Sequence, residues 1–470
     1  MPRPTYDQLM ELVETLVREN TELKAHIARQ DVRIAELERQ LAANSRNSSK
    51  PPSSDGLGKP APKSLRTKPG RKPGGQHGHK GDTLRQITDP DEVIRHEPVC
   101  CTGCGAGLAR AREVGVARRQ IFDLPPATIH VTEHQLITKR CACGTSTRAD
   151  APSGVNAPAA YGPRVSAVMV YLYMGQYLSK SRTAHALSEL FSIPVSAGTV
   201  SAATARAAGD LDEFRTEVTA RIIASDVAHF DETGFRAAGA LHWLHSASTS
   251  LFTLITCHRR RGREAMNAAG ILPVFTGIAV HDCWSPYDTY PQLTHSLCNA
   301  HLLRELIAVV DHHLAYADDP RSCCWASQVI DSLMAIKDHT DTRAGPADAG
   351  LLAGHRRLIV DAAHIRAAQV LPGKVGQKHR ALARRIGTRI DDYLRFACDP
   401  NAPFDNNAAE REIRMAKLRQ KVSGGMRTLA GAEHFAALRS YLATTAKHGI
   451  DGLDALTRLA TGNPWIPQST

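Results

Sequence analysis

The chain has few aromatic residues and no long apolar run. Phe, Trp and Tyr make up 5% of its 470 residues, so stacking on single-stranded bases is a less natural way to bind nucleic acid than contact with a duplex backbone. No apolar stretch is long enough to span a bilayer, and the N-terminal Met-Pro-Arg-Pro-Thr lacks the core of a signal peptide. We therefore expect a soluble, cytoplasmic protein.

Acidic residues are also in short supply. Asp and Glu number 47 against 58 Lys and Arg, which gives a net charge of +11 and a pI of 9.2. This excess of positive charge predicts a polyanionic partner, for which double-stranded DNA is the natural candidate. The length allows two to four domains and at least one sizeable core.

Residues 1–44 carry a seven-residue repeat of apolar positions. One seam position holds Val13, Asn20, Ile27, Ile34 and Leu41, and the other holds Leu9, Leu16, Leu23, Gln30 and Leu37. β-Branched residues at the first position with Leu at the second favour two parallel helices, and a single buried Asn fixes their register. We predict a coiled coil through which two or more copies of the chain associate, with a surface helix packed on its own domain as the alternative.

Residues 45–90 have the composition of a disordered linker followed by a basic arm. Ser, Asn and Pro dominate the first part, and the second places seven Lys and Arg among Pro and Gly, with Arg71 and Lys72 at its centre. Such an arm suits DNA phosphates or a minor groove. A charged linker that only aids solubility is the alternative.

Residues 91–150 contain two cysteine pairs. Cys101 and Cys104 precede one Gly, and Cys141 and Cys143 precede another, on either side of a strand-like segment at 128–137. Two thiolate pairs on tight turns suit a structural Zn²⁺ ion in a small ribbon, which would organise the module and not catalyse. The second pair has one intervening residue where two are commoner, so Cys100 or His134 remains a possible ligand, and buried free thiols are the alternative to zinc.

Residues 151–221 have a helical pattern. A helix from Arg182 to Phe191, a short turn and a second helix from Thr199 resemble a helix-turn-helix, which predicts a DNA-binding region, although a packing role fits the same pattern.

Residues 222–430 change to a strand pattern. Strands are expected at 225–231, 241–245, 251–256 and 277–281, with a turn at 232–234 and a helix at 263–269. This order, with Asp282 directly after the last strand, is that of a ribonuclease H-like α/β core. The stretch 299–400 reads as a large all-helical insertion, and residues 431–470 as a C-terminal helical segment. The predicted fold class is thus a multidomain α/β protein.

A helix is predicted from Asp405 to the Gly424-Gly425 pair, with capping side chains at 405–407. Helical spacing places Glu410 at the head of a basic row formed by Arg414, Lys417 and Lys421, beside an apolar face made of Ala409, Ile413 and Ala416. An exposed helix with a Glu410–Arg414 ion pair is the plain alternative.

Three carboxylates in this element order indicate a metal site. Asp231 and Asp282 end strands and Glu410 begins a helix, and carboxylate oxygens are the ligands that Mg²⁺ (or Mn²⁺) prefers. Two such ions would serve an in-line displacement at a phosphodiester. Asp226 and Glu232 are rivals for the first ligand. Taken singly, Asp231 could be a turn residue and Asp282 a helix cap.

The same motifs resemble those of the DDE transposases of the insertion-sequence sixty-six family. The matching segments are 47–55, 71–79, the cysteine pairs, 231–234, His281-Asp282, 298–305 and 405–411 with Gly424-Gly425. The resemblance implies catalytic acids at Asp231, Asp282 and Glu410, and a transposase that cuts the 3′ ends of its element and joins them to target DNA. The segment after Glu410 departs from the pattern of many members, which carry Gly-Arg-Lys and an aromatic there.

The resemblance also implies partners. We expect double-stranded DNA at the element ends and the target, held by Arg71, Lys72, Arg411, Arg414, Lys417 and Lys421, a location at the nucleoid when bound, and accessory proteins from the same element. The rival hypotheses are an inert zinc-containing DNA-binding protein and a plain metal-dependent nuclease.

Overall fold

The computed structural model describes residues 6–42, 84–125, 127, 129–155, 157–316, 324–343, 346–369 and 373–468. It divides into two compact units, Met1–Pro62 with Thr132–Thr470, and Lys63–Val131. In the described ranges, no helix is both long and apolar enough to cross a membrane. The predicted basic arm with Arg71 and Lys72 lies outside the described residues.

The N-terminal heptads form one uninterrupted helix, α1 (Tyr6–Ala42). Its seam side chains are open to solvent: Val13, Leu16, Leu23, Ile27, Ile34 and Leu37 are between 42% and 60% exposed. The predicted helix is present, and its pairing with a second copy stays a prediction.

The strand predicted at 128–137 is wrong. The described residues of this stretch form no strand, and the apolar side chains Val131 and Ile137 are exposed, because alternation makes a strand only where a neighbour can pair with it. A hairpin begins just afterwards, where β1 (Thr138–Arg140) pairs antiparallel with β2 (Ser146–Arg148). Its turn carries Cys141 and Cys143.

The helical region consists of α2 (Pro163–Val170), the π-turn η2 (Tyr171–Gly175), α3 (Lys180–Phe191), α4 (Ala197–Gly209) and α5 (Asp212–Ile223). Ser179 and Ser196 cap α3 and α4, since their hydroxyls accept the backbone N–H groups of Arg182 and Thr199. The predicted pair of helices is therefore present. Leu187 of α3 and Val200 of α4 are fully buried in hydrophobic clusters, so this pair also has a packing role.

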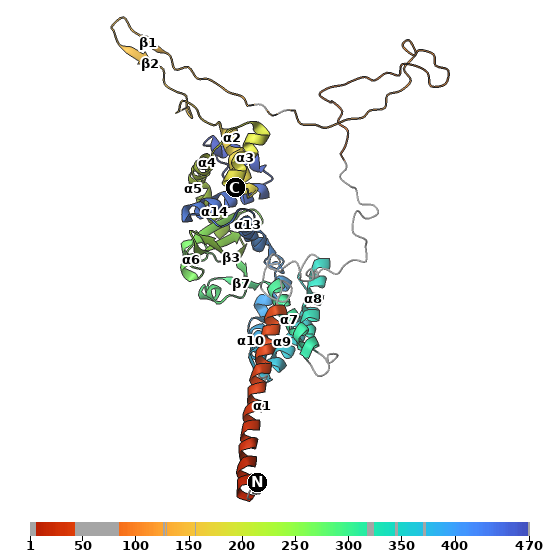
Figure 1. Ribbon diagram of the computed structural model, residues 1–470, viewed down its shortest axis with the longest axis vertical. Coiled ribbons are helices and arrows are strands. Elements are labelled where there is room, and N and C mark those ends of the chain that lie inside the picture. Colours follow the sequence, from red (N-terminus) through yellow and green to blue (C-terminus); the bar gives the residue numbers. More distant parts are fainter. Residues whose placement is uncertain are drawn as a thin grey trace, which may run out of the picture. The chain divides into compact units, whose positions relative to one another are not determined.

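A five-stranded mixed sheet forms the centre of the larger unit (Figure 1). Its strands are β3 (Val227–Ala237), β4 (Ala240–Ser248), β5 (Thr253–His258), β6 (Ile278–His281) and β7 (Thr294–Leu297). They lie in the order β5-β4-β3-β6-β7. Strand β4 runs antiparallel to both of its neighbours, β5 and β3, and β6 and β7 run parallel to β3.

The turn predicted at 232–234 is wrong. β3 continues through these residues to Ala237, and the chain reverses at Ala238 and Gly239, whose φ angles are +50° and +76°. Two successive residues with positive φ give the tight turn that suits the twist of a hairpin. Strand β7 was not predicted, because three of its four residues are polar and only Leu297 is apolar. Helix α6 (Arg263–Ala268) and the 3₁₀ turn η3 (Ser285–Thr289) complete this part.

The predicted insertion is helical throughout its described residues and has its own core. It contains α7 (Asn299–Tyr316), α8 (Trp325–Arg343), α9 (Ala349–Ala368), α10 (Gly373–Thr388), α11 (Ile390–Tyr393) and α12 (Arg395–Cys398). Leu306, Ile336 and Ile386 are fully buried in a cluster that is separate from the core around the sheet.

The C-terminal helices cover the sheet. Ala409, Ile413 and Ala416 of α13 (Asn407–Ser423) are buried, as the helical spacing predicts, and the helix ends at Gly424 with φ +75°. Helix α14 (Leu429–Lys447) closes the β5 edge, because Ser440 and Thr444 accept the backbone N–H groups of Ile255 and Thr253. Helix α15 (Gly452–Ala460) follows.

The start of β6 gives a test of this packing. A Cβ atom at Gly277 would lie 2.5 Å from the carbonyl oxygen of Asp226 and 2.8 Å from that of Ser225, so Gly277→Ala should lower the free energy of unfolding by about 2–3 kcal/mol, measured by urea denaturation. Gly209→Ala is the control, since no atom lies within 4 Å of its Cβ position. Equal midpoints for the two variants would contradict the arrangement.

Candidate active site

The pairing of β3 with β6 sets the position of two acids. The last paired residues are His229 and Val280, and two residues further along each strand come Asp231 and Asp282. Because parallel strands keep their register, these two residues lie side by side. Asp282 directly follows the end of β6, whereas Asp231 lies within β3, so the prediction that Asp231 ends a strand is wrong. Asp231 accepts the backbone N–H of Glu232 (2.8 Å), and Asp282 accepts that of Trp284 (3.1 Å).

Negative charge accumulates around Asp231. Burial raises the pKa of Asp231 well above its usual range, and the carboxylates of Glu232, Asp282 and, more weakly, Glu410 add to this effect. A carboxylate with several acidic neighbours and little compensation favours a bound cation. Across the part of the chain that the structure describes, no three His, Cys, Asp or Glu side chains are grouped closely enough to hold a metal ion by themselves.

The third predicted acid, Glu410, lies in the first turn of α13, and its carboxylate is paired with two arginines. It pairs with Arg414 one turn further along the helix, as predicted, and Nη2 of Arg304 lies 3.6 Å from its Oε2. Burial alone would raise the pKa of Glu410, but the two arginines lower it below the ordinary value. Arg304 comes from the first turns of α7, in the insertion.

Asn406 anchors the start of α13, which the sequence analysis did not foresee. It occupies the N-cap position, yet its side chain makes no cap. Its Nδ2 donates to the carbonyl of Phe230 (2.7 Å), and its Oδ1 accepts from Nδ1 of His229 (2.9 Å). Asp405 instead accepts the backbone N–H of Asn407. Asn406 thus attaches the Glu410 helix to β3 directly beside Asp231.

The two rivals for the first ligand lie elsewhere. Asp226 is exposed at the opposite end of β3. Glu232 is buried and already paired, because Arg261 donates to its Oε1 (2.7 and 2.9 Å) and the hydroxyl of Tyr287 donates to its Oε2 (2.9 Å). Burial, together with Asp282, raises the pKa of Glu232 to about 7. Asp226 therefore lies at the wrong end of β3 to share a metal ion with Asp282, and the carboxylate of Glu232 already has partners within the fold.

Two members of the predicted basic row make contacts within the fold. Arg414 pairs with Glu410, while Lys421 is exposed, as is the neighbouring Arg411. Lys417 donates instead to the backbone carbonyl of Gly234, and burial lowers its pKa. A side chain held in this way supports the packing of α13 on β3 more directly than it contacts a ligand.

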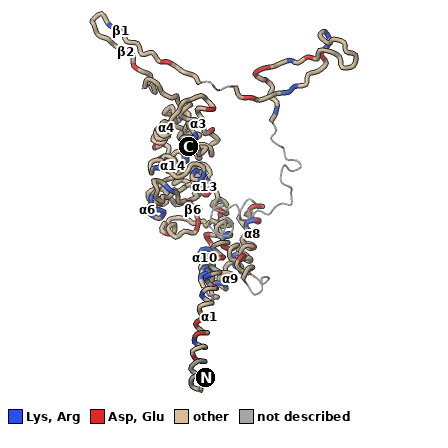
Figure 2. The backbone as a smooth tube through the Cα atoms, viewed as in Figure 1, with Lys and Arg blue, Asp and Glu red and all other residues tan. Residues whose placement is uncertain are grey.

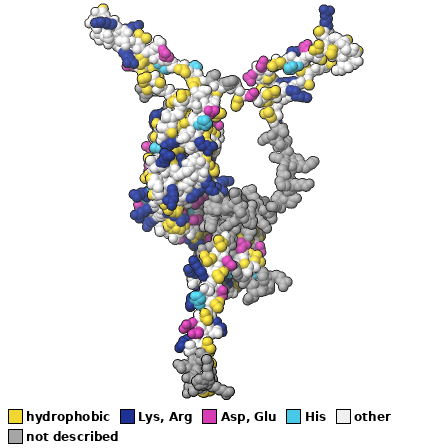
Figure 3. All heavy atoms as spheres, in the orientation of Figure 1, with side chains coloured by type: hydrophobic (Ala, Val, Ile, Leu, Met, Phe, Trp, Pro, Cys, Tyr) yellow, Lys and Arg dark blue, Asp and Glu magenta, His cyan; other side chains and the backbone are white. Residues whose placement is uncertain are grey.

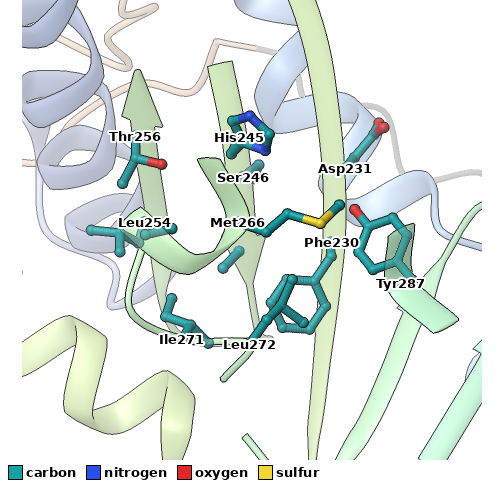
Figure 4. Close-up of a pocket in the computed structure, with 12 residues that line it drawn as sticks. Phe230, Asp231, His245, Ser246, Leu254, Thr256, Met266, Ile271, Leu272 and Tyr287 are labelled. Atoms are coloured by element: carbon teal, nitrogen blue, oxygen red, sulfur yellow. The ribbon is translucent and has the colours of Figure 1, made fainter. Parts of the chain in front are cut away.

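A narrow, mainly apolar pocket lies behind the acids (Figure 4). Phe230, Met266 and Leu272 fill its walls, and the ring of Tyr287 closes one side. Asp231 belongs to its lining, but Figure 4 shows the carboxylate on the other side of β3 from Phe230. The pocket thus lies behind the strand, with its apolar walls away from the carboxylate of Asp231.

The two cysteine pairs lie in different units, so each is described by itself. Gly105 and Gly144, which follow the pairs, have φ angles of +77° and +90°, as tight turns require. Hydrogen bonds from the backbone at Cys104 and Gly103 lower the pKa of Cys101, and the Thr145 hydroxyl heads the groups that lower the pKa of Cys143 to about 7. Both effects favour the thiolate form that binds metal.

Replacement of Asn406 tests the link between α13 and β3. Asn406→Ala leaves a buried carbonyl and a buried imidazole nitrogen without partners, and should lower the free energy of unfolding by about 1–3 kcal/mol in chemical denaturation. The neighbouring Asn407 is exposed and bonds only locally to Asp405, so Asn407→Ala should change it by less than about 0.5 kcal/mol. An unchanged midpoint for Asn406→Ala would refute the anchoring role.

Comparison with known families identifies most of the chain. Residues 159–434 match the Transposase IS66 family, and residues 98–144 match the zinc-finger binding domain of transposase IS66. Residues 1–85 match a family of unknown function (DUF6444). No curated protein matches the chain.

These matches confirm the family resemblance and imply DNA transposition, with DNA as the substrate and zinc bound by the cysteine module. Since the first match covers more than half of the chain, the protein belongs to the IS66 family of transposases.

Proposed function

We propose that this transposase cuts the 3′ ends of its element and joins them to target DNA by metal-dependent phosphodiester transfer. The observation that carries the proposal is the parallel register that puts Asp231 beside Asp282, with Glu410 near enough to raise the pKa of Asp231. The strand order β5-β4-β3-β6-β7, with the first three strands antiparallel, supports a ribonuclease H-like catalytic core.

Asp231, Asp282 and Glu410 would hold the divalent ions, Mg²⁺ or Mn²⁺. The donor set fits, because hard cations take carboxylate oxygens and need only one or two carboxylates each, with phosphate and water completing the shell. Two bound ions would activate the attacking oxygen and neutralise the leaving one. The chain itself supplies the negative charge of these three acids and the paired strands β3 and β6 that hold two of them side by side.

Basic residues around this site support contact with the DNA backbone. Figure 2 shows Lys and Arg on the segments labelled α6 and α13, and Figure 3 shows dark-blue side chains over the same part of the face in view. Arg411 and Lys421 of α13 are exposed, as are Arg259 in the turn after β5 and Arg263 at the start of α6. Such side chains neutralise phosphates and position a duplex without reading its sequence. Arg71 and Lys72 would extend this contact from the basic arm.

The turn after β5 is fixed next to the acids. Its Arg261 stacks on Trp284 (3.9 Å from the guanidinium carbon to the ring centre) and on Trp243 (5.0 Å) while it pairs with Glu232. Glu232 directly follows Asp231 in β3. Arg261 thus attaches this turn to the residue that follows Asp231, on the opposite face of β3.

The remaining parts would assemble the complex. The exposed apolar seam of α1 suits pairing with a second copy of the chain, as a two-ended DNA substrate requires. The zinc module would hold Zn²⁺ through Cys101, Cys104, Cys141 and Cys143 and stabilise a DNA-binding surface. Accessory proteins of the same element and a location at the nucleoid belong to the same proposal.

Neutral replacements of the three acids test the catalytic assignment. Asp231→Asn, Asp282→Asn and Glu410→Gln should each reduce cleavage of a labelled element end in Mg²⁺ at least about a hundredfold, because the ions lose a ligand, while DNA binding in a mobility-shift assay is kept. Asp226→Asn is the matched control and should cleave normally. Strand transfer retained by any one of the three variants would remove that residue from the site.

Metal analysis tests the zinc module. Purified protein should contain about one zinc ion per chain by mass spectrometry of the metal, and Cys104→Ser or Cys143→Ser should lose most of it. Cys398→Ser, at an exposed cysteine of the insertion, should retain it. Zinc retained by Cys143→Ser would shift the assignment to Cys100 or His134.

A further inference from the structure

Two arginines converge on one carboxylate beside the proposed metal site. Arg414 hydrogen-bonds to Oε1 of Glu410, and Nη2 of Arg304 lies 3.6 Å from Oε2. The side chains of Arg304 and Glu410 are only 18% and 17% exposed. Arg414 is more open, with 41% of its side chain exposed. Since one carboxylate carries a single negative charge, Arg304, Arg414 and Glu410 together carry one positive charge in excess, at a place that water only partly reaches.

The same group leaves hydrogen-bond donors unused. In the described part of the chain, Nε of Arg414 is buried and has no hydrogen-bond partner, and the same holds for Nδ1 of His301. His301 lies three residues before Arg304 on α7, and it is close enough to Arg304, Asp282 and Glu410 for their charges to act on it. A buried polar atom without a partner calls for an explanation, and here two of them lie beside the same pair of charged side chains.

We propose that Arg304 and Arg414 form a binding site for a phosphate group of the DNA strand, and that Glu410 fills this site while DNA is absent. The proposal rests on the function proposed above and adds Arg304, from the helical insertion, to its DNA contacts. Guanidinium groups pair with phosphate as readily as with carboxylate. A phosphate that enters therefore takes over the arginines and frees Glu410.

Release of Glu410 couples DNA binding to metal binding. A carboxylate held by two guanidinium groups attracts a divalent cation weakly, whereas a freed carboxylate next to Asp231 and Asp282 attracts it strongly. By thermodynamic linkage, DNA then raises metal affinity and metal raises DNA affinity by the same factor. The third ligand thus becomes available only when the substrate phosphate is in place, which limits metal-dependent cleavage to bound DNA.

The test measures Mn²⁺ binding to the full chain at low ionic strength, with and without a short DNA duplex. The electron paramagnetic resonance signal of free Mn²⁺ reports the unbound ion. The duplex alone is titrated separately, so that the Mn²⁺ that it binds can be subtracted. For the wild type, the duplex should tighten Mn²⁺ binding at least about fivefold. Arg304→Gln should bind Mn²⁺ at least about threefold more tightly than the wild type without DNA, and should lose most of the dependence on the duplex.

Three variants sharpen the comparison. Arg414→Gln removes the other cation and should act in the same direction, so the outcome does not depend on one variant folding. Arg304→Lys keeps the charge and should retain duplex-dependent binding. Arg356→Gln removes an exposed arginine of the insertion that pairs with Asp391, and should behave as the wild type.

The outcomes separate this proposal from the proposed function. If Asp231→Asn and Asp282→Asn abolish Mn²⁺ binding but neither Arg304→Gln nor Arg414→Gln tightens it, the phosphate site is wrong and the metal site stands. If both aspartate variants bind Mn²⁺ as the wild type does, the metal site is wrong and the phosphate site falls with it.

Discussion

The parallel pairing of β3 with β6 is the constraint on which the candidate site depends. Asp231 and Asp282 are 51 positions apart in the sequence, and only this register places them next to each other. Backbone hydrogen bonds fix the register, and Gly277 permits it, because no side chain would fit where β6 passes the carbonyls of Ser225 and Asp226. A strand shifted by one residue would turn one of the acids to the opposite face.

The carboxylates around the β3–β6 pair lie in two different environments. Glu232 is neutralised within the fold by Arg261 and Tyr287, so its carboxylate serves the packing of the turn after β5. Among the described residues, the hydrogen bonds to Asp231 and Asp282 come from backbone N–H groups. Adjacent carboxylates in one strand thus have different roles, because alternate residues of a strand face opposite sides. The uncompensated side is the one that faces α13.

The helical insertion contributes to the site although it has a core of its own. Its two ends meet, since Asn299 donates to the carbonyl of Phe404 and the backbone N–H of Asn406 donates to Sγ of Cys298. An element whose ends lie close together can be inserted without disturbing the sheet. The same contact brings the first turns of α7, with His301 and Arg304, to the head of α13. Arg304 and Glu410, which are far apart in the sequence, thereby come into contact.

Much of the secondary structure followed from the sequence by itself, whereas the roles of Asp231, Asp282 and Glu410 stay a prediction. Period and capping residues predicted the helix of Glu410 with its buried face, the strand order before Asp282 and the helical insertion, since these signals are local. What local signals could not give is where side chains point across the fold. Lys417 belongs to a basic row by its spacing but bonds to Gly234. Asn406 was predicted as a helix cap but bonds to β3. The turn expected at 232–234 lies at 238–239, because residues 232–234 pair with β4. The sequence determined which chemical groups this protein has, and tertiary packing decided which of them are already paired, because a partner from another element is invisible to any local pattern.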